Sequence, residues 1–371
     1  MEFLRRSLPL AVVIGLTLCM HWYVARRFRG WTVRAGAILA SLWMLIAVPA
    51  LQMGRAELLT TNQISYLTAG SLVWVIMAIS ASSWVLLRGA ADFNPERRRF
   101  LTVGAPMAAA APMLVAGGGV FIARSGLYTR EVPLKIKGLH KDLDGLRIAQ
   151  VTDIHYGPFF GRAELERAVA MANECKPHVT VVTGDMITRR GDDLEGCLAV
   201  LRGLKADAGV WGCHGNHEEY AKVMEKAKLL GAKQGLRFLR GEAAALRFGQ
   251  ATLNLAGDDY QHMGADMLPD AGELLKAGAL NVLLQHNPQA FPRAAALGFD
   301  VMLAGHTHGG QINLGVFGEN LNIARMFTPY VRGEYQRDGK LLYVSSGLGT
   351  VAVPIRLGAP PEVTVIRLCA V

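Results

Sequence analysis

Cysteine is scarce in this chain, which has five cysteines in 371 residues and no two of them in CxxC spacing. Cys19 lies in an apolar stretch near the start, and Cys175, Cys197, Cys213 and Cys369 are scattered over the rest of the sequence. A structural zinc site made of thiolates is therefore not expected. One or two disulfides are possible if the second half of the chain is exported, although the spacing of the cysteines selects no pairing.

Lysine is absent from residues 1–123, where eleven arginines and four acidic residues give a net charge of +7. The rest of the chain carries only +2 of the total charge of +9. The excess of basic residues thus belongs to the first third, and it gives no support for nucleic-acid binding. Internal repeats and low-complexity segments are lacking as well.

Long apolar runs are missing after Ala123, and all of them fall in the first third of the sequence. Four stretches there each approach the ~20 residues that span a bilayer, namely Leu8–Val24, Ala35–Met53, Tyr66–Leu87 and Leu101–Ala123. A signal peptide alone does not explain this pattern, because three further apolar segments follow the first. We therefore expect residues 1–124 to form a transmembrane region with four helices.

Arginines are distributed unequally over the loops between these stretches. The first and third loops carry four each, whereas the N-terminus has two and the second loop has one. By the positive-inside rule, the first and third loops are cytoplasmic. This predicts a multi-pass inner-membrane protein, with residues 125–371 forming a second domain in the periplasm or outside the cell, and a cytoplasmic domain is the alternative.

The run from Arg97 to Leu101 reads Arg-Arg-Arg-Phe-Leu and precedes a weakly hydrophobic stretch rich in alanine and glycine. This order resembles a twin-arginine export signal, here internal, which would carry an already folded domain across the membrane. The alternative is a stop-transfer flank, in which the arginines cluster for topology alone.

From about Ser125 the pattern changes to short apolar strands separated by amphipathic helices. Two or three strands are expected within Leu236–Ala256, and the other expected strands are Val132–Gly138, Leu146–Thr152, His178–Thr183, Gly209–Cys213, Leu280–Gln285, Asp300–Ala304, Leu341–Ser345 and Glu362–Leu368. The expected helices are Arg162–Cys175, Asp192–Lys205 and Glu218–Leu230. Strand–helix alternation followed by strand-rich sequence predicts an α/β fold of two sheets flanked by helices.

Five of these strands end in residues that can bind metal: Asp153-Ile154-His155, Gly184-Asp185, Gly215-Asn216-His217-Glu218, His286 and His306-Thr307-His308. Groups at the carboxyl ends of neighbouring strands converge on one crevice in layered α/β folds. Each has an alternative explanation taken alone, since Asp185 could cap a helix, Asn216 could serve a turn and His286 could be a core histidine. Their joint occurrence favours one shared site.

With these residues in order, the sequence resembles the calcineurin-like metallophosphoesterase superfamily. The pattern D-x-H, G-D, G-N-H-[D/E], H, G-H-x-H is complete from Asp153 to His308. The residues around these motifs are similar to the membrane-associated or twin-arginine-exported bacterial branch. The resemblance covers about residues 130–371 and implies a four-layer sandwich, with two mixed β-sheets flanked by helices.

The resemblance also implies two metal sites. The first metal would be held by Asp153, His155 and His308, and the second by Asn216, His286 and His306, with Asp185 bridging both. His306 and His308 would thus serve different metals. Carboxylate, imidazole and amide ligands without thiolate suit two divalent ions such as Mn, Fe or Zn.

A shared carboxylate can hold two cations ~3.5–4 Å apart, a spacing at which both contact one phosphoester. Metal coordination lowers the pKa of water, so hydroxide is available for attack on phosphorus near neutrality. His217 would then protonate the leaving oxygen as a general acid. Glu218 is expected to orient His217.

These residues predict a membrane-anchored, metal-dependent hydrolase that cleaves phosphomonoesters or phosphodiesters. A lipid or another cell-envelope phosphoester is one substrate option, and Phe159 and Phe160 near the site would suit an acyl chain, with core packing as the alternative. The competing hypothesis is a non-catalytic metal-binding membrane sensor. The sequence selects neither a substrate nor an oligomeric state.

Overall fold

The computed structural model describes residues 95–259, 267–316 and 319–371, together with scattered positions between residues 15 and 80. The chain divides into two units, Met1–Gly119 and Val120–Val371. Helix α4 (Pro95–Ser125) contains the boundary between them. The five cysteines are all free thiols.

The prediction of four transmembrane helices ahead of the two sheets is wrong. The first three predicted spans fall largely outside the described residues, and the fourth, Leu101–Ala123, lies in α4. Within the described part of the chain, no helix is both long and apolar enough to cross a membrane. Helix α4 has the length, but much of it is alanine and glycine, which contribute little apolar surface. The periplasmic location and the export signal stay predictions from sequence.

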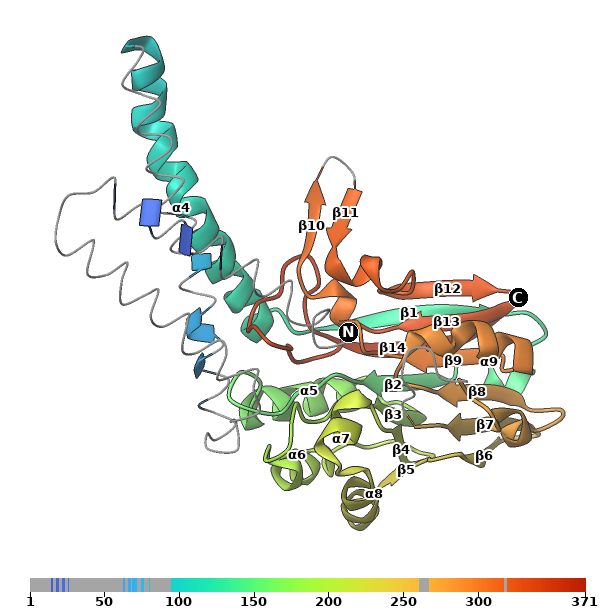
Figure 1. The fold of residues 1–371 in the computed structure, drawn as a ribbon. Helices are drawn as coiled ribbons and strands as arrows, with labels where there is room; N and C mark the ends of the chain where they lie inside the picture. The colour runs from blue at the N-terminus through green and yellow to red at the C-terminus, as the bar shows by residue number, and fades with distance from the viewer. Residues whose placement is uncertain are drawn as a thin grey trace. The chain divides into compact units, whose positions relative to one another are not determined.

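Two six-stranded sheets form the unit from Val120 to Val371 (Figure 1). The first sheet has the order β1-β14-β2-β3-β4-β5, with strands β1 (Tyr128–Ile136), β2 (Arg147–Val151), β3 (Val179–Thr183), β4 (Val210–Cys213), β5 (Leu236–Phe238) and β14 (Glu362–Ala370). Strands β2 to β5 run parallel, and β14 is antiparallel to β2 but parallel to β1. This sheet is therefore mixed.

The second sheet has the order β12-β13-β9-β8-β7-β6. Its strands are β6 (Glu242–Phe248), β7 (Ala251–Gly257), β8 (Leu280–Leu284), β9 (Val301–Ala304), β12 (Gly333–Arg337) and β13 (Lys340–Val344). The four central strands are parallel, and the edge strands β6 and β12 pair antiparallel. It is mixed as well.

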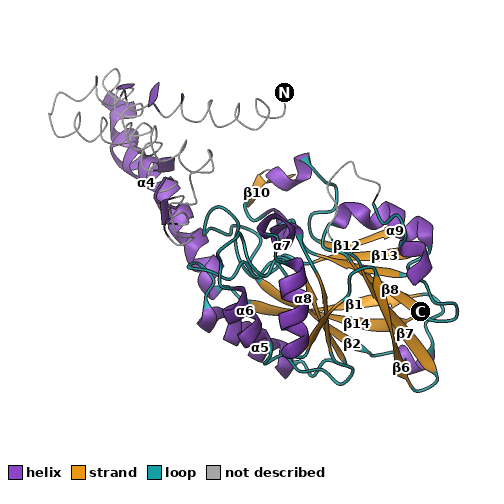
Figure 2. Cartoon of the chain, turned by 60° about the horizontal axis from the view of Figure 1, so that its bottom comes forward, coloured by secondary structure: helices purple, strands orange, loops and turns teal. Residues whose placement is uncertain are grey.

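Side-chain alternation along the strands builds three apolar layers. Ile148 of β2 packs in the layer between the sheets, whereas its neighbours Ala149 and Val151 face the helices on the outer side. Figure 2 shows these helices gathered on one side and α9 (Phe291–Leu297) on the other, and the first group consists of α5 (Arg162–Glu174), α6 (Leu194–Leu201) and α8 (Met224–Lys233). Helix, sheet, sheet and helix are thus stacked, and the predicted two-sheet α/β architecture fits.

Local differences from the sequence prediction have physical causes. The helix expected over Glu218–Leu230 is two helices, α7 (Asn216–Ala221) and α8, because Lys222 adopts a left-handed conformation with φ of 57°. Helix α6 is shorter than expected. Sequence patterns missed α9, the edge strand β12 and the hairpin of β10 (Asn313–Val316) and β11 (Glu319–Asn322), which is polar and lacks a continuous apolar run.

Candidate metal centre

All predicted ligands follow the carboxyl ends of strands, and two of them begin short helices, since Asn216 begins α7 and His308 begins a 3₁₀ turn. Sheet one supplies the loops after β2, β3 and β4, and sheet two supplies those after β8 and β9. The side chains in these loops are buried or nearly so, and they are Asp153, His155, Asp185, Asn216, His286, His306 and His308. The site therefore takes its residues from both sheets.

Asp153, His155 and His308 form one group whose ligand atoms lie within 4.8 Å of one another. The Nε2 atoms of His155 and His308 are 3.1 Å apart, and His308 Nε2 is 3.3 Å from Asp153 Oδ1. Three donor atoms that converge in this way can serve one metal ion.

Asp185, His286 and His306 form another group within the same limit of 4.8 Å. His286 Nε2 is 3.0 Å from Asp185 Oδ2, and the Asn216 amide oxygen lies 2.8 Å from His306 Nδ1. The same Asp185 oxygen is 3.7 Å from His155 Nε2 in the first group. The carboxylate of Asp185 thus contacts both groups.

The charges of this cluster fit cations. Among the described residues, no lysine or arginine forms an ion pair with Asp153 or Asp185, although both carboxylates are buried. Burial and the neighbouring Asp185 raise the pKa of Asp153 to about 6, and His286 only partly offsets this. Two buried carboxylates that repel each other in this way provide a favourable place for positive charge.

Most of the imidazoles are in the neutral form that metals require. Burial lowers the pKa values of His155 and His308 well below the ordinary range, and that of His306 to about 4. Burial also acts against a charged His286, but the Asp185 and Asp153 carboxylates outweigh it and raise the pKa to about 10. The two carboxylates therefore favour a positive charge at His286.

Backbone strain is concentrated at the same residues. Of the eleven non-glycine residues with positive φ in the described chain, five are predicted ligands, with φ between 47° and 74°: Asp153, His155, Asp185, His306 and His308. Each such conformation costs about 1–3 kcal/mol and persists only where the surroundings hold it. Strain of this kind is typical of functional sites.

Two glycines of the motifs are required by close packing. A Cβ atom at Gly215 would collide with the carboxylate of Asp185, and one at Gly305 would collide with that of Asp153. The glycines therefore leave room for the two carboxylates.

Glu218 differs from the sequence expectation. Its buried carboxylate accepts hydrogen bonds from the backbone N–H groups of Gly215, Asp185 and Met186, at 2.8, 2.9 and 2.7 Å. It thus joins the loop after β3 to the loop after β4. Glu218 positions Asp185 rather than the ring of His217, and its partners 33 and 32 residues away leave no sequence signal.

His217 lies at the edge of the cluster, with its Nε2 atom 4.0 Å from Asp185 Oδ2. Its Nδ1 faces the carbonyl oxygen of Thr188, which leaves Nε2 as the nitrogen turned to the cluster. The Thr188 hydroxyl lies 3.1 Å from Nδ1 of His155. Sequence reasoning missed Thr188, which contacts both histidines.

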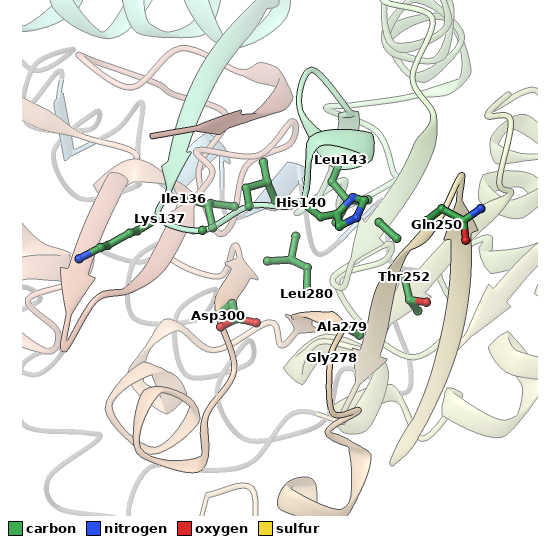
Figure 3. A pocket seen from close by; sticks show the side chains of 13 residues that line it. Ile136, Lys137, His140, Leu143, Gln250, Thr252, Gly278, Ala279, Leu280 and Asp300 are labelled. Carbon is green, nitrogen blue, oxygen red and sulfur yellow. The ribbon is translucent and has the colours of Figure 1, made fainter.

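Three other histidines in the described part of the chain, His140, His178 and His214, are not members of these ligand groups. His178 accepts a hydrogen bond from the backbone N–H of Arg147, His214 bonds to Asp259 and stacks on Phe238, and His262 falls outside the described residues. His140 lines a separate cavity of about 360 Å³ together with Leu143 and Leu280 (Figure 3). These positions agree with structural roles.

Comparisons with known proteins point to one family. The sequence profile described as calcineurin-like phosphoesterase matches residues 146–310. The metallophosphoesterase YkuE of Bacillus subtilis is 32% identical over 294 residues, which are 74% of this chain and 97% of YkuE. A metallophosphoesterase of Aquifex aeolicus is 29% identical over 252 residues, 67% of this chain and 92% of that protein.

A relative from Danio rerio is a transmembrane protein with a metallophosphoesterase domain. It is 30% identical over 252 residues, which are 64% of this chain and 56% of the relative. The chain thus spans about half the length of this protein.

Proposed function

Because the chain belongs to the calcineurin-like metallophosphoesterase family and is a metal-dependent phosphoesterase, we propose that it hydrolyses phosphoesters at a dinuclear metal centre. Asp153, His155 and His308 hold one divalent ion in this proposal. Asn216, His286 and His306 hold the other, and Asp185 bridges them. The observation that carries the proposal is the contact of Asp185 with both His155 and His286, at 3.7 and 3.0 Å.

The bound metals, Mn, Fe or Zn, would hold the phosphoester oxygens and supply the activated water. The protein's own part is to orient these groups. Glu218 fixes the loop of Asp185, and Thr188 fixes the ring of His155. Strain at the ligand loops is retained because hydrogen bonds hold them, such as those from the His306 N–H to the buried Asp153 carboxylate.

His217 acts as the general acid in this proposal. Its Nδ1–H donates to the Thr188 carbonyl, so the second nitrogen can carry the proton that the leaving oxygen needs. Its side chain is 16% exposed, so it is accessible to a substrate, unlike the fully buried His155 beside it. The substrate in this proposal is a phosphomonoester or phosphodiester, and a lipid-like phosphoester is one option.

The test separates this enzyme from a non-catalytic metal-binding sensor. His217→Ala in the purified full-length protein should retain bound metal, measured by elemental analysis. Its turnover of alkyl and dialkyl phosphates, whose alkoxide leaving groups need a proton, should fall about 10²–10⁴-fold, and that of p-nitrophenyl esters should fall less. His140→Ala is the control, because His140 lies in the separate cavity. Metal binding without turnover in the wild-type protein would favour the sensor.

A further inference from the structure

A cavity of about 490 Å³ opens directly beside the candidate metal centre. His306 and His308 are among the residues that line it, and its apolar lining residues are Ala324, Phe327 and Val351. This volume lies within the range of small-molecule sites. Its surface is mostly apolar, although it adjoins a cluster of carboxylates and imidazoles.

The polar side chains around this cavity are bonded to backbone. Gln311 bonds to the backbone of Val351 and Val353 through both ends of its amide. The Gln289 amide nitrogen donates to the Phe327 carbonyl at 2.7 Å, and the Thr307 hydroxyl donates to the Val331 carbonyl. Few groups are left to recognise the hydroxyls of a sugar or the edge of a nucleobase.

Phe327 stands at this cavity with 63% of its surface exposed, next to Met326 at 81%. The turn that presents them is well anchored. The backbone N–H groups of Phe327 and Thr328 donate to the Ala324 carbonyl, both at 3.0 Å, and Asn322 caps the turn through the Arg325 N–H. A fixed turn thus keeps apolar side chains in water, which costs free energy that a bound apolar group would recover.

From the contact of this cavity with His306 and His308, we propose that it binds an aliphatic chain of the phosphoester substrate. This inference rests on the proposed function, because the phosphate must occupy the metal centre while the chain fills the cavity. The enzyme then prefers amphiphilic phosphoesters. Phe160, which the sequence suggested for this role, is 3% exposed and belongs to the core.

The test is a chain-length series on the Mn²⁺-loaded full-length protein. Methyl, butyl and octyl p-nitrophenyl phosphates and the matching alkyl phosphates are compared below their micelle concentrations. We expect kcat/KM to rise at least about tenfold from methyl to octyl, because each buried methylene adds to binding. Phenyl p-nitrophenyl phosphate is included to distinguish a preference for an aliphatic chain from a preference for an aromatic group.

Two variants test whether the preference for long chains arises in this cavity. Phe327→Ser removes apolar surface and should reduce the octyl-to-methyl ratio about threefold or more, and Ala324→Phe, which fills the cavity, should favour short chains. Leu229→Ser is the matched control: Leu229 is 65% exposed on α8, does not line the cavity, and should leave the ratio unchanged.

The outcomes distinguish this inference from the proposed function. Equal turnover of all chain lengths, a preference for the phenyl ester alone, or a ratio that both cavity variants leave unchanged would overturn the inference while the phosphoesterase stands. Absence of turnover on every ester would overturn the proposed function itself.

Discussion

Glu218 joins two loops of the site by accepting backbone N–H groups, and this makes it more sensitive than its position outside the ligand set suggests. Glu218→Gln would place an amide NH₂ group against N–H donors, and two buried donors would lose their acceptor because each carboxylate oxygen accepts from two N–H groups. We expect activity to fall about 10–100-fold, as for other residues that orient metal ligands, and stability to fall by about 1–3 kcal/mol.

Metal titration and steady-state kinetics of this variant check the prediction. Glu166→Gln is the matched control, since Glu166 is half exposed in a helical ion pair with Arg162 and such pairs contribute little. A Glu218→Gln enzyme with unchanged metal affinity and turnover would show that the loop after β3 is held by other contacts.

The convergence of the candidate ligands could be predicted from the sequence, although their binding of metal stays a prediction. Asp153, Asp185 and His286 each follow an apolar strand, and strand ends converge in this type of fold. The sequence could not predict the roles of Glu218, Thr188 and Phe327. Their partners are backbone atoms or a cavity formed by distant segments, and neither leaves a pattern in the sequence.

At the level of elements, Glu362 connects strands of both sheets. It starts β14 in the first sheet, and its buried carboxylate accepts hydrogen bonds from Tyr128 of β1 and from Tyr343 of β13 in the second sheet. It also accepts from the N–H of Ser346 and pairs with Arg332. This hydrogen-bond network links the two sheets next to the loop after β13.

Glu362→Gln should therefore destabilise the fold by about 2 kcal/mol at neutral pH, or about 4–8 °C in melting temperature. Burial raises the pKa of Glu362, but the Ser346 N–H, Arg332 and Tyr128 outweigh it, so the net pKa lies below its ordinary value. The stabilisation is thus complete above the unfolded pKa of about 4.3 and disappears as the pH falls through the lower folded value.

Melting curves of wild type and Glu362→Gln between neutral pH and strongly acidic pH measure this difference. The two melting temperatures should approach each other at acidic pH. A constant difference over the whole range would mean that the variant acts through packing and not through the ionised carboxylate.

Apolar periodicity was sufficient for the buried strands and for α5, because their side chains alternate or repeat between core and surface. Apolar periodicity failed to predict the elements whose secondary structure depends on tertiary contacts. Lys222 breaks a continuous helical pattern, and the hairpin of β10 and β11 lacks a continuous apolar run.

At the scale of the whole molecule, the site depends on both sheets at once. Removing metal with EDTA should therefore abolish turnover and also lower the melting temperature of the catalytic unit by about 5–10 °C, since a ligand at 100 times its Kd contributes about 2.7 kcal/mol. Readdition of Mn²⁺ should restore both. A melting temperature that EDTA leaves unchanged would argue against metal bound between the sheets.

Strand β14 is a second feature on which the stability of the whole unit depends. It lies between β1 and β2, so a chain that ends at Pro361 would leave β1 without a partner and expose the edge of β2. We expect this truncated protein to lack the cooperative melting of the full chain, as measured by circular dichroism. Removal of Val371 alone, which is 74% exposed and outside β14, should have little effect.

The place of β14 also sets an order of events during synthesis. Tyr128 of β1 bonds to Glu362 of β14 across 234 positions of sequence, so the first strand of the unit must wait for the last to leave the ribosome. Until then the first sheet has an open edge at β2, which other unfinished chains can pair with. Contacts this distant form slowly. A chain whose synthesis stops before Glu362 therefore lacks the strand that completes the first sheet, however much of the unit has already been made.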